Sequence, residues 1–315
     1  MHKGGSALCM PSFFVIGPPR TGTSWLHEVL NQHTVLPTVS KETRFFDSHF
    51  RRGFRWYSSH FHQHRAGQPI GEIAPTYFAS SDARERISRL PSVARVICIF
   101  RNPVERILSL YRLKSAYGFI PWTFEEALLN DPELLESSRY STHLTAWREA
   151  LGKERVMATI FDDLQHQPQA FVDALAGFIG IPPFELSQSQ ITRVHSSDTM
   201  TKPRNYFRTH GAMMFADWLK ARRLNAIVTA FKRSPLVKLF LGGGRSFDEP
   251  SHNVWLSLYD YFRPEVEALE TMLGRDLSAW KYLDNVQVTA PQSTELSEPP
   301  SDVMFNARKI SRSAY

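Results

Sequence analysis

The chain has 315 residues, of which 42% are hydrophobic and 22% are charged. This length allows one large globular domain or two small ones, and the core can be sizeable, so disulfides or structural metals are not required for stability. The net charge of +6 suits a polyanionic partner, either a nucleic acid or a small polyanionic ligand; the alternative is mild basicity without functional meaning, because the charges are dispersed rather than gathered in one block.

Cysteine usage and hydropathy predict a soluble protein of a reducing compartment. Only two cysteines are present, Cys9 and Cys98, which leaves no disulfide framework and favours a cytoplasmic location. The apolar stretch near the start is about five residues long, which is shorter than the core of a signal peptide. No run approaches the ~20 apolar residues of a membrane span.

Short apolar runs predict four buried strands, at 12–16, 70–74, 94–100 and 155–161. A helical pattern follows the first run, and an amphipathic helix is predicted at 169–180 after the fourth. After the third run, Asn102 and Pro103 are typical of a helix start. This alternation predicts an α/β fold with a central parallel sheet flanked by helices.

The later part of the chain changes character twice. Residues 200–282 are predicted to be mostly helical, with the glycines at 242–244 as a break. From about residue 284 the sequence becomes polar and contains several prolines. We therefore expect one domain over 11–285 and a loosely ordered tail over 286–315.

The stretch GPPRTGTS (17–24) lies between the first predicted strand and its helix, and it nearly matches the phosphate-binding pattern G-x-x-x-x-G-K-[ST]. Thr23 stands where that pattern has lysine. The unpaired N–H groups at a helix start favour an anion, and Arg20, Thr21 and Ser24 add further donors. The stretch therefore predicts a phosphate cradle; the alternative is a plain strand-to-helix turn.

Arg101 follows the strand predicted at 94–100, at a position where a nucleotide triphosphatase carries an acidic magnesium ligand. An arginine there repels a metal ion and attracts a phosphate. We therefore predict a metal-free site for a nucleotide with two separate phosphate groups, the second bound by Arg101 and Ser109. The alternative is that Arg101 forms an ion pair with Glu105.

Both stretches resemble motifs of one enzyme family. PPRTGTSWL (18–26) resembles the 5′-phosphosulfate loop of sulfotransferases that use 3′-phosphoadenosine 5′-phosphosulfate (PAPS), and FRNPVERILSLYR (100–112) resembles their 3′-phosphate motif. The likeness extends over about 11–282 and is greatest to the heparan sulfate type and its bacterial relatives. It implies a P-loop-like sulfotransferase fold, PAPS as donor, PAP as product and no metal. The donor-binding residues that it implies are Arg20, Thr21, Gly22, Thr23, Ser24, Trp25, Arg101 and Ser109.

The segment KETRFFD (41–47) resembles the one that supplies the catalytic glutamate in the heparan sulfate group. The resemblance implies that Glu42 is the general base and that Arg20, helped by Lys41, offsets charge on the departing phosphate. The alternative is that Glu42 is a solvated carboxylate paired with Lys41 or Arg44.

Other positions depart from the family or are less specific. Ile73 stands where the family often has lysine, which makes the acceptor site less like that for heparan sulfate. In TKPRNYFR (201–208), Lys202 and Arg204 either belong to a basic segment that closes over the nucleotide or lie in a surface loop.

The sequence thus predicts an enzyme that moves the sulfuryl group from PAPS to a hydroxyl or amine of a carbohydrate or another small molecule, without nucleic acid. Two alternatives remain: a P-loop nucleotide kinase or NTPase, which requires Mg²⁺ and ATP, and a non-catalytic carbohydrate- or nucleic-acid-binding module on the same fold. The sequence does not identify the acceptor, the choice between O- and N-sulfation, or the oligomeric state.

Overall fold

The computed structural model describes residues 10–61, 67–91, 94–194, 201–221 and 244–283. The chain divides into one unit of residues 1–283 and another of residues 284–315, and all of the described residues belong to the first. The predicted boundary between a domain and a tail stays a prediction, because residues 284–315 lie outside the described part.

Four parallel strands form the central sheet, in the order β2-β1-β3-β4. They are β1 (Phe13–Gly17), β2 (Gly71–Ile73), β3 (Arg95–Phe100) and β4 (Val156–Ile160). Each strand lies within one residue of its predicted range, and the predicted α/β fold with a parallel sheet is confirmed. The strands are rich in β-branched and aromatic residues, which suit a sheet that is buried on both faces.

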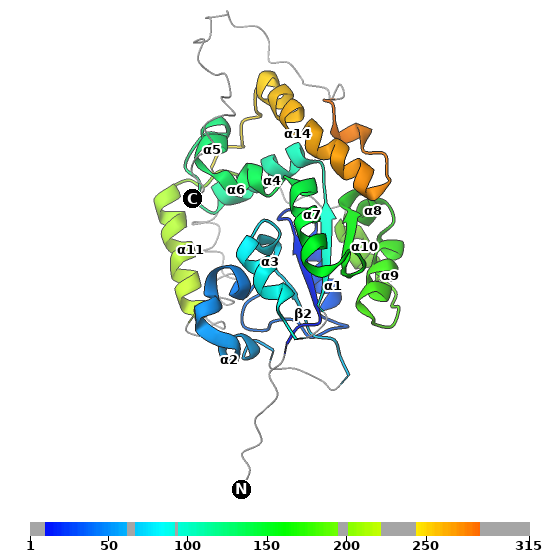
Figure 1. Ribbon diagram of the computed structural model, residues 1–315. Helices are drawn as coiled ribbons and strands as arrows, with labels where there is room; N and C mark the ends of the chain where they lie inside the picture. Colours follow the sequence, from blue (N-terminus) through cyan, green and yellow to red (C-terminus); the bar gives the residue numbers. More distant parts are fainter. Residues whose placement is uncertain (1–9, 62–66, 92–93, 195–200, 222–243, 284–315) are drawn as a thin grey trace, which may run out of the picture. The chain divides into compact units, whose positions relative to one another are not determined.

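Helices cover both faces of this sheet (Figure 1). One face packs against α3 (Ser81–Ser88) and α7 (Tyr140–Leu151). The opposite face packs against α1 (Thr23–Leu30) and α9 (Pro168–Ile179). Because successive strand residues point to opposite faces, β1 and β3 contribute to both hydrophobic clusters.

A third hydrophobic cluster forms along α4 (Pro103–Ala116). It includes side chains of α5 (Phe124–Asn130), α6 (Pro132–Glu136) and α14 (His252–Leu273). The start of α4 is as predicted, because the Asn102 side chain accepts hydrogen bonds from two backbone N–H groups of the first turn and a proline follows it. Thus α4 begins directly beyond the carboxyl end of β3.

The remaining helices are short or late in the chain. They are α2 (Gly53–Ser58), α8 (Phe161–His166), α10 (Gln188–Val194), α11 (Tyr206–Ala221) and the single turns at Phe45–His49, Phe50–Arg52, Pro75–Tyr77, Lys153–Arg155 and Ser278–Trp280. The region predicted as helical contains α11 and α14, while residues 222–243, with two of the three predicted breaker glycines, lie outside the described part. No described helix combines the length and apolarity needed to cross a membrane.

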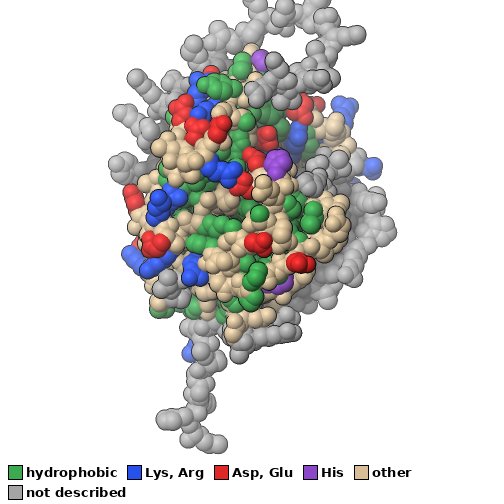
Figure 2. Space-filling view, turned by 90° about the vertical axis from the view of Figure 1, so that its right-hand side faces the viewer, with side chains coloured by type: hydrophobic (Ala, Val, Ile, Leu, Met, Phe, Trp, Pro, Cys, Tyr) green, Lys and Arg blue, Asp and Glu red, His purple; other side chains and the backbone are tan. Residues whose placement is uncertain are grey.

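Charged side chains of both signs are mixed on the surface that Figure 2 shows. On the described part of that face, basic and acidic groups lie interspersed among apolar ones, without a continuous basic patch. Elsewhere in the described residues, ion pairs join neighbouring elements, such as Arg275 with Asp163 and Arg193 with Glu28. A nucleic-acid footprint would instead gather Lys and Arg on one face.

Candidate active site

A cavity of about 1080 Å³ lies at the carboxyl edge of the sheet. Residues that follow each of the four strands line it: Pro19 after β1, Pro75 after β2, Arg101 after β3 and Phe161 after β4. Open α/β sheets bind their ligands at this edge, because the loops there are free to carry functional side chains. The topology thus brings together motifs that are far apart in the sequence.

The loop after β1 has a tightly turned backbone. Arg20 and Gly22 both adopt left-handed conformations, with φ of 75° and 82°. Gly22 caps α1 without a side chain, and Gly22, Thr23 and Ser24 line the cavity, so the uncapped start of α1 faces it. A Cβ at Gly22 would lie only 2.7 Å from Leu164 Cδ2, so this position requires glycine. An uncapped helix start with hydroxyl donors fits a phosphate group.

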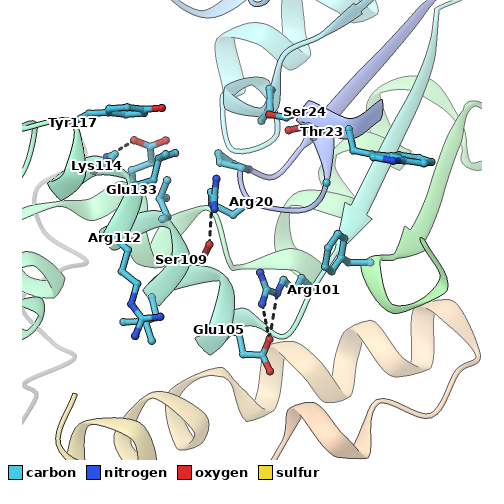
Figure 3. Close-up of a pocket in the computed structure, with 18 of the residues that line it drawn as sticks. Arg20, Thr23, Ser24, Arg101, Glu105, Ser109, Arg112, Lys114, Tyr117 and Glu133 are labelled. Carbon is cyan, nitrogen blue, oxygen red and sulfur yellow. Dashed lines mark hydrogen bonds and ion pairs between the residues drawn. The ribbon is translucent and has the colours of Figure 1, made fainter. Parts of the chain in front are cut away.

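Arg20 joins this loop to the middle of α4. Its Nε donates a hydrogen bond to Ser109 Oγ at 2.8 Å, across 89 residues of sequence (Figure 3). The two stretches that predicted two phosphate sites therefore meet in one cavity, with Arg20 between them. In this arrangement Ser109 contacts Arg20, whereas the sequence had grouped it with Arg101.

Arg101 forms an ion pair with Glu105, at 2.9 Å from NH2 to Oε2, and its guanidinium lies 5.4 Å from the ring centroid of Phe161. Figure 3 shows this pair at the start of α4, and both residues line the cavity. The alternative predicted for Arg101 is therefore observed. It does not exclude phosphate binding, because Arg101 lines the cavity and a pair this close to solvent is weak. A phosphate would compete with Glu105 for Arg101.

Lys41 links the loop to Glu42. Its Nζ donates a hydrogen bond to Ser24 Oγ at 2.8 Å and lies 4.0 Å from Glu42 Oε1. Both side chains line the cavity, with about one third of their surface exposed (35% for Lys41 and 31% for Glu42). Burial in the cavity wall raises the pKa of Glu42 and lowers that of Lys41, while the opposite charge of Lys41 limits the rise at Glu42. A carboxylate with a raised pKa suits proton abstraction.

A fully buried carboxylate behind this loop has no counterpart in the sequence-based prediction. Glu72 on β2 accepts hydrogen bonds on Oε1 from the Thr43 N–H at 3.0 Å and the Thr43 hydroxyl at 2.5 Å. Its Oε2 accepts one from the Tyr57 hydroxyl at 2.8 Å, and the Tyr77 hydroxyl reaches both oxygens. Burial raises the pKa of Glu72 to about 7. A glutamate inside the buried strand pattern IGEIA was the signal that could have revealed it, since an acid there requires partners.

Two of the predicted donor-binding residues lie differently from the rest of the loop. Thr21 is fully buried and donates its hydroxyl hydrogen to the Pro18 carbonyl at 2.7 Å, so its side chain stabilises the turn and is not part of the cavity wall. Trp25 lines the cavity, and its Nε1 donates to the Gln190 carbonyl at 2.8 Å. That bond ties α1 to α10.

The basic segment after residue 200 approaches the cavity only in part. Thr201 lines it, but Lys202 and Arg204 do not. Lys202 Nζ lies 2.6 Å from Asp248 Oδ2, and Arg204 is exposed. Their role in nucleotide binding stays a prediction. The described residues also contain no group of three His, Cys, Asp or Glu side chains placed to hold a metal ion.

The comparisons with known proteins define the family. Residues 10–214 match the model of the sulfotransferase domain. The chain therefore belongs to the sulfotransferase family, and the predicted family and enzyme class are confirmed.

Curated relatives match part of the chain and are longer than it. The chain is 27% identical over 198 residues to bifunctional heparan sulfate N-deacetylase/N-sulfotransferase 2 of Bos taurus, which covers 56% of this chain and 22% of the relative. It is 30% identical over 143 residues to the membrane-associated sulfotransferase kil1 of Dictyostelium discoideum, with 42% and 30% covered. Heparan sulfate glucosamine 3-O-sulfotransferase 5 of Mus musculus is 27% identical over 194 residues, with 55% and 54% covered. The chain thus spans between about a fifth and a half of the length of these relatives.

A solved structure supports the fold. The crystal structure of a sulfotransferase from Alicyclobacillus acidocaldarius superposes with a TM-score of 0.62 and 19% identity, and it covers 87% of this chain and 100% of that chain. At 19% identity, this similarity supports the fold and does not extend to the chemistry of the site.

Proposed function

We propose that this protein transfers the sulfuryl group of PAPS to a hydroxyl or amine of a carbohydrate or another small molecule, and that Glu42 is the general base. The observation that carries the proposal is the position of Lys41, which hydrogen-bonds to Ser24 of the phosphate loop and lies beside Glu42. A donor phosphate held by the loop would therefore lie next to the proposed base. The relatives named for heparan sulfate sulfotransfer support a carbohydrate acceptor.

The residues of the cavity fit a donor with two separated phosphate groups. The uncapped start of α1, the Ser24 hydroxyl and Arg20 suit the 5′ end. Arg101, at the end of β3, suits the 3′-phosphate. The cavity volume of about 1080 Å³ leaves room for a nucleotide together with an acceptor.

In this mechanism Glu42 accepts the proton of the acceptor hydroxyl or amine while its oxygen or nitrogen bonds to sulfur. The bond between sulfur and the bridging phosphate oxygen breaks, and PAP leaves. Arg20 and Lys41 supply positive charge where the negative charge of the leaving phosphate grows, which lowers the barrier most in a site shielded from water. Burial lowers the pKa of Lys41, which makes its ammonium group a better proton donor to a hydrogen bond with that oxygen.

The two alternatives have less support. A nucleotide kinase would need a lysine at the position of Thr23 and an acidic residue at that of Arg101. A binding module without activity would not need a shielded carboxylate beside the phosphate loop. The cytoplasmic location expected from the cysteine content remains a proposal.

Sulfur-labelled PAPS tests the proposal directly. The protein is incubated in EDTA with labelled PAPS and separate panels of sugars, amino sugars, phenols and aliphatic alcohols, and labelled product and PAP are both quantified. We expect transfer to at least one class, with PAP formed in equal amount. Glu125→Gln, which removes an exposed carboxylate on α5 outside the cavity, is the matched control for Glu42→Gln. Failure of every panel to release PAP above the rate without protein would contradict the proposal.

A further inference from the structure

The cavity has two ends, which α4 connects (Figure 3). Arg101 and Glu105 lie at the start of the helix, and Ser109 with Arg20 lies at its middle. Lys114 and Tyr117 lie at its far end, beside Glu133 of α6; these three residues are called the distal end below. At 1.5 Å per residue, Ser109 and Tyr117 are separated by roughly 12 Å along the helix axis. When the donor is bound at Arg101 and Arg20, the distal end remains open for the acceptor.

The only cation of the distal end is already neutralised by two carboxylates. Lys114 Nζ lies 2.6 Å from Asp131 Oδ2 and 2.6 Å from Glu133 Oε2. Asp131 is largely buried, whereas the Glu133 side chain is 40% exposed and lines the cavity. The negative charge of Glu133 also reaches Glu42 and contributes to its raised pKa. Glu42 has its own cation, Lys41, at 4.0 Å, so two carboxylates, Asp131 and Glu133, face the single ammonium group of Lys114.

The neighbouring arginines do not reverse this balance. Arg44, whose charge also reaches Glu42, forms an ion pair with Asp47 at 3.5 Å. Arg112 forms an ion pair with Glu249. Neither pair adds net charge, and neither does the pair of Lys41 with Glu42, so Lys114 with its two carboxylates leaves one excess negative charge among these described side chains. A like charge brought into such a site is strongly disfavoured.

We propose that the distal end selects an acceptor without negative charge: a neutral or amine-bearing ring whose hydroxyl or ammonium groups donate hydrogen bonds to Glu133 and whose face lies against Tyr117. This proposal rests on the proposed sulfuryl transfer. Sugar rings place C–H groups on aromatic faces and direct hydroxyl donors outward, and an exposed carboxylate beside a half-buried tyrosine matches both features. A polyanionic chain of the heparan type would place its carboxylates and sulfates beside Glu133 and Asp131.

Matched sugars test this inference. Methyl glucoside, methyl glucuronide and methyl glucosaminide share one ring and differ in a single charged group. Their binding to the complex of the protein with PAP is measured by calorimetry, and their sulfation by labelled PAPS. We expect the neutral and amine-bearing sugars to bind at least tenfold more tightly than the uronide. Equal or tighter binding of the uronide, or binding of none of the three, would overturn the inference.

Two substitutions of Glu133 make the test specific. Glu133→Gln should reduce severalfold the preference for the neutral and amine-bearing sugars over the uronide. Glu133→Lys should reverse this preference in favour of the uronide, whereas Glu125→Gln on α5 should leave it unchanged. The affinity for PAP alone should stay the same in all three variants, which shows that they fold. If PAP does not bind to the wild-type protein, the proposed function itself fails. If PAP binds and the Glu133→Lys variant keeps the wild-type preference among the sugars, only the present inference fails.

Discussion

Glu72 holds Thr43 by two hydrogen bonds, one to its backbone N–H and one to its hydroxyl, and Thr43 directly follows Glu42. The residue next to the proposed base is therefore hydrogen-bonded to a carboxylate that is fully buried on β2. A buried acid with four hydrogen-bond donor groups around it is costly to displace, because any lost partner leaves a polar atom unsatisfied. The position of the loop that carries Glu42 therefore depends on the interior of the protein.

This burial gives the free energy of unfolding a pH dependence. The folded-state pKa of Glu72, about 7, is above the value of 4.5 expected in the unfolded chain. The stability that protonated Glu72 contributes is therefore complete below about pH 4.5 and is lost as the pH rises through 7. Between these two pH values, the free energy of unfolding of the wild type should fall by on the order of 3 kcal/mol relative to that of Glu72→Gln. Urea unfolding at a series of pH values measures this difference, with Glu85→Gln on the surface as control. If the free energy of unfolding of the wild type and of Glu72→Gln changed with pH in parallel, the prediction would be contradicted.

Replacing the proposed base should affect turnover and not donor binding. Glu42→Gln keeps the shape of the side chain and leaves the loop and Arg101 intact, so the affinity for PAP should stay nearly the same. The kcat should fall by about 10²–10⁴, which is the usual contribution of a positioned base. Steady-state kinetics with an identified acceptor, together with PAP titration, measures both effects. A variant with near-normal kcat would remove Glu42 from the mechanism.

The same residue should determine the acid side of the pH profile. Glu42 has to be ionised to accept a proton, and burial raises its pKa above 4.5. The kcat/KM of the wild type should therefore fall as the pH decreases through this raised value, and the residual activity of Glu42→Gln should not show that fall. An acid limb that persists unchanged in the variant would assign it to another group.

Arg101 should distinguish donors by their 3′-phosphate. Arg101→Ala is expected to weaken the binding of PAP by roughly tenfold to a hundredfold, which corresponds to the loss of a charge-assisted hydrogen bond of about 1.5–3 kcal/mol. Adenosine 5′-phosphosulfate, which lacks that phosphate, should be much less affected. Calorimetry with both ligands checks this, and equal weakening of both would mean that Arg101 acts on the fold.

Glu105 competes for Arg101, so its removal should have the opposite effect. Because the ion pair is partly exposed, Glu105→Gln should strengthen PAP binding by about two- to fivefold. Glu85→Gln, which breaks a pair with Arg89 at the same i,i+4 spacing on α3, is the matched control and should leave PAP binding unchanged. Weaker PAP binding in Glu105→Gln would show that the carboxylate orients Arg101 and does not compete with the phosphate.

The sequence predicted the elements whose signals are local. All four strands and the start of α4 follow from apolar runs, an asparagine cap and a proline, each of which acts within a few residues. It also predicted that the residues after β1 and β3 belong to one site, since parallel strands place their carboxyl ends at one edge.

Contacts between distant segments could not be predicted in the same way. The bond between Arg20 and Ser109 depends on where α4 lies relative to the loop, and the network around Glu72 gathers residues from three separate segments. Tyr140 and His143 of α7 are both buried, and Tyr140 belongs to the core cluster because α7 packs on the sheet. Such arrangements are set by tertiary packing, for which a single sequence carries no direct signal.

The most direct test of the account is a calorimetric titration of the wild-type protein with PAP and, separately, with ATP and Mg²⁺. The proposed donor site relies on arginines, a lysine and a helix start. PAP should therefore bind in the presence of EDTA with a Kd of about 1 μM or tighter, and Mg²⁺–ATP should bind far more weakly. Binding of Mg²⁺–ATP that is tighter than that of PAP, or loss of PAP binding in EDTA, would contradict the assignment of this cavity to PAPS.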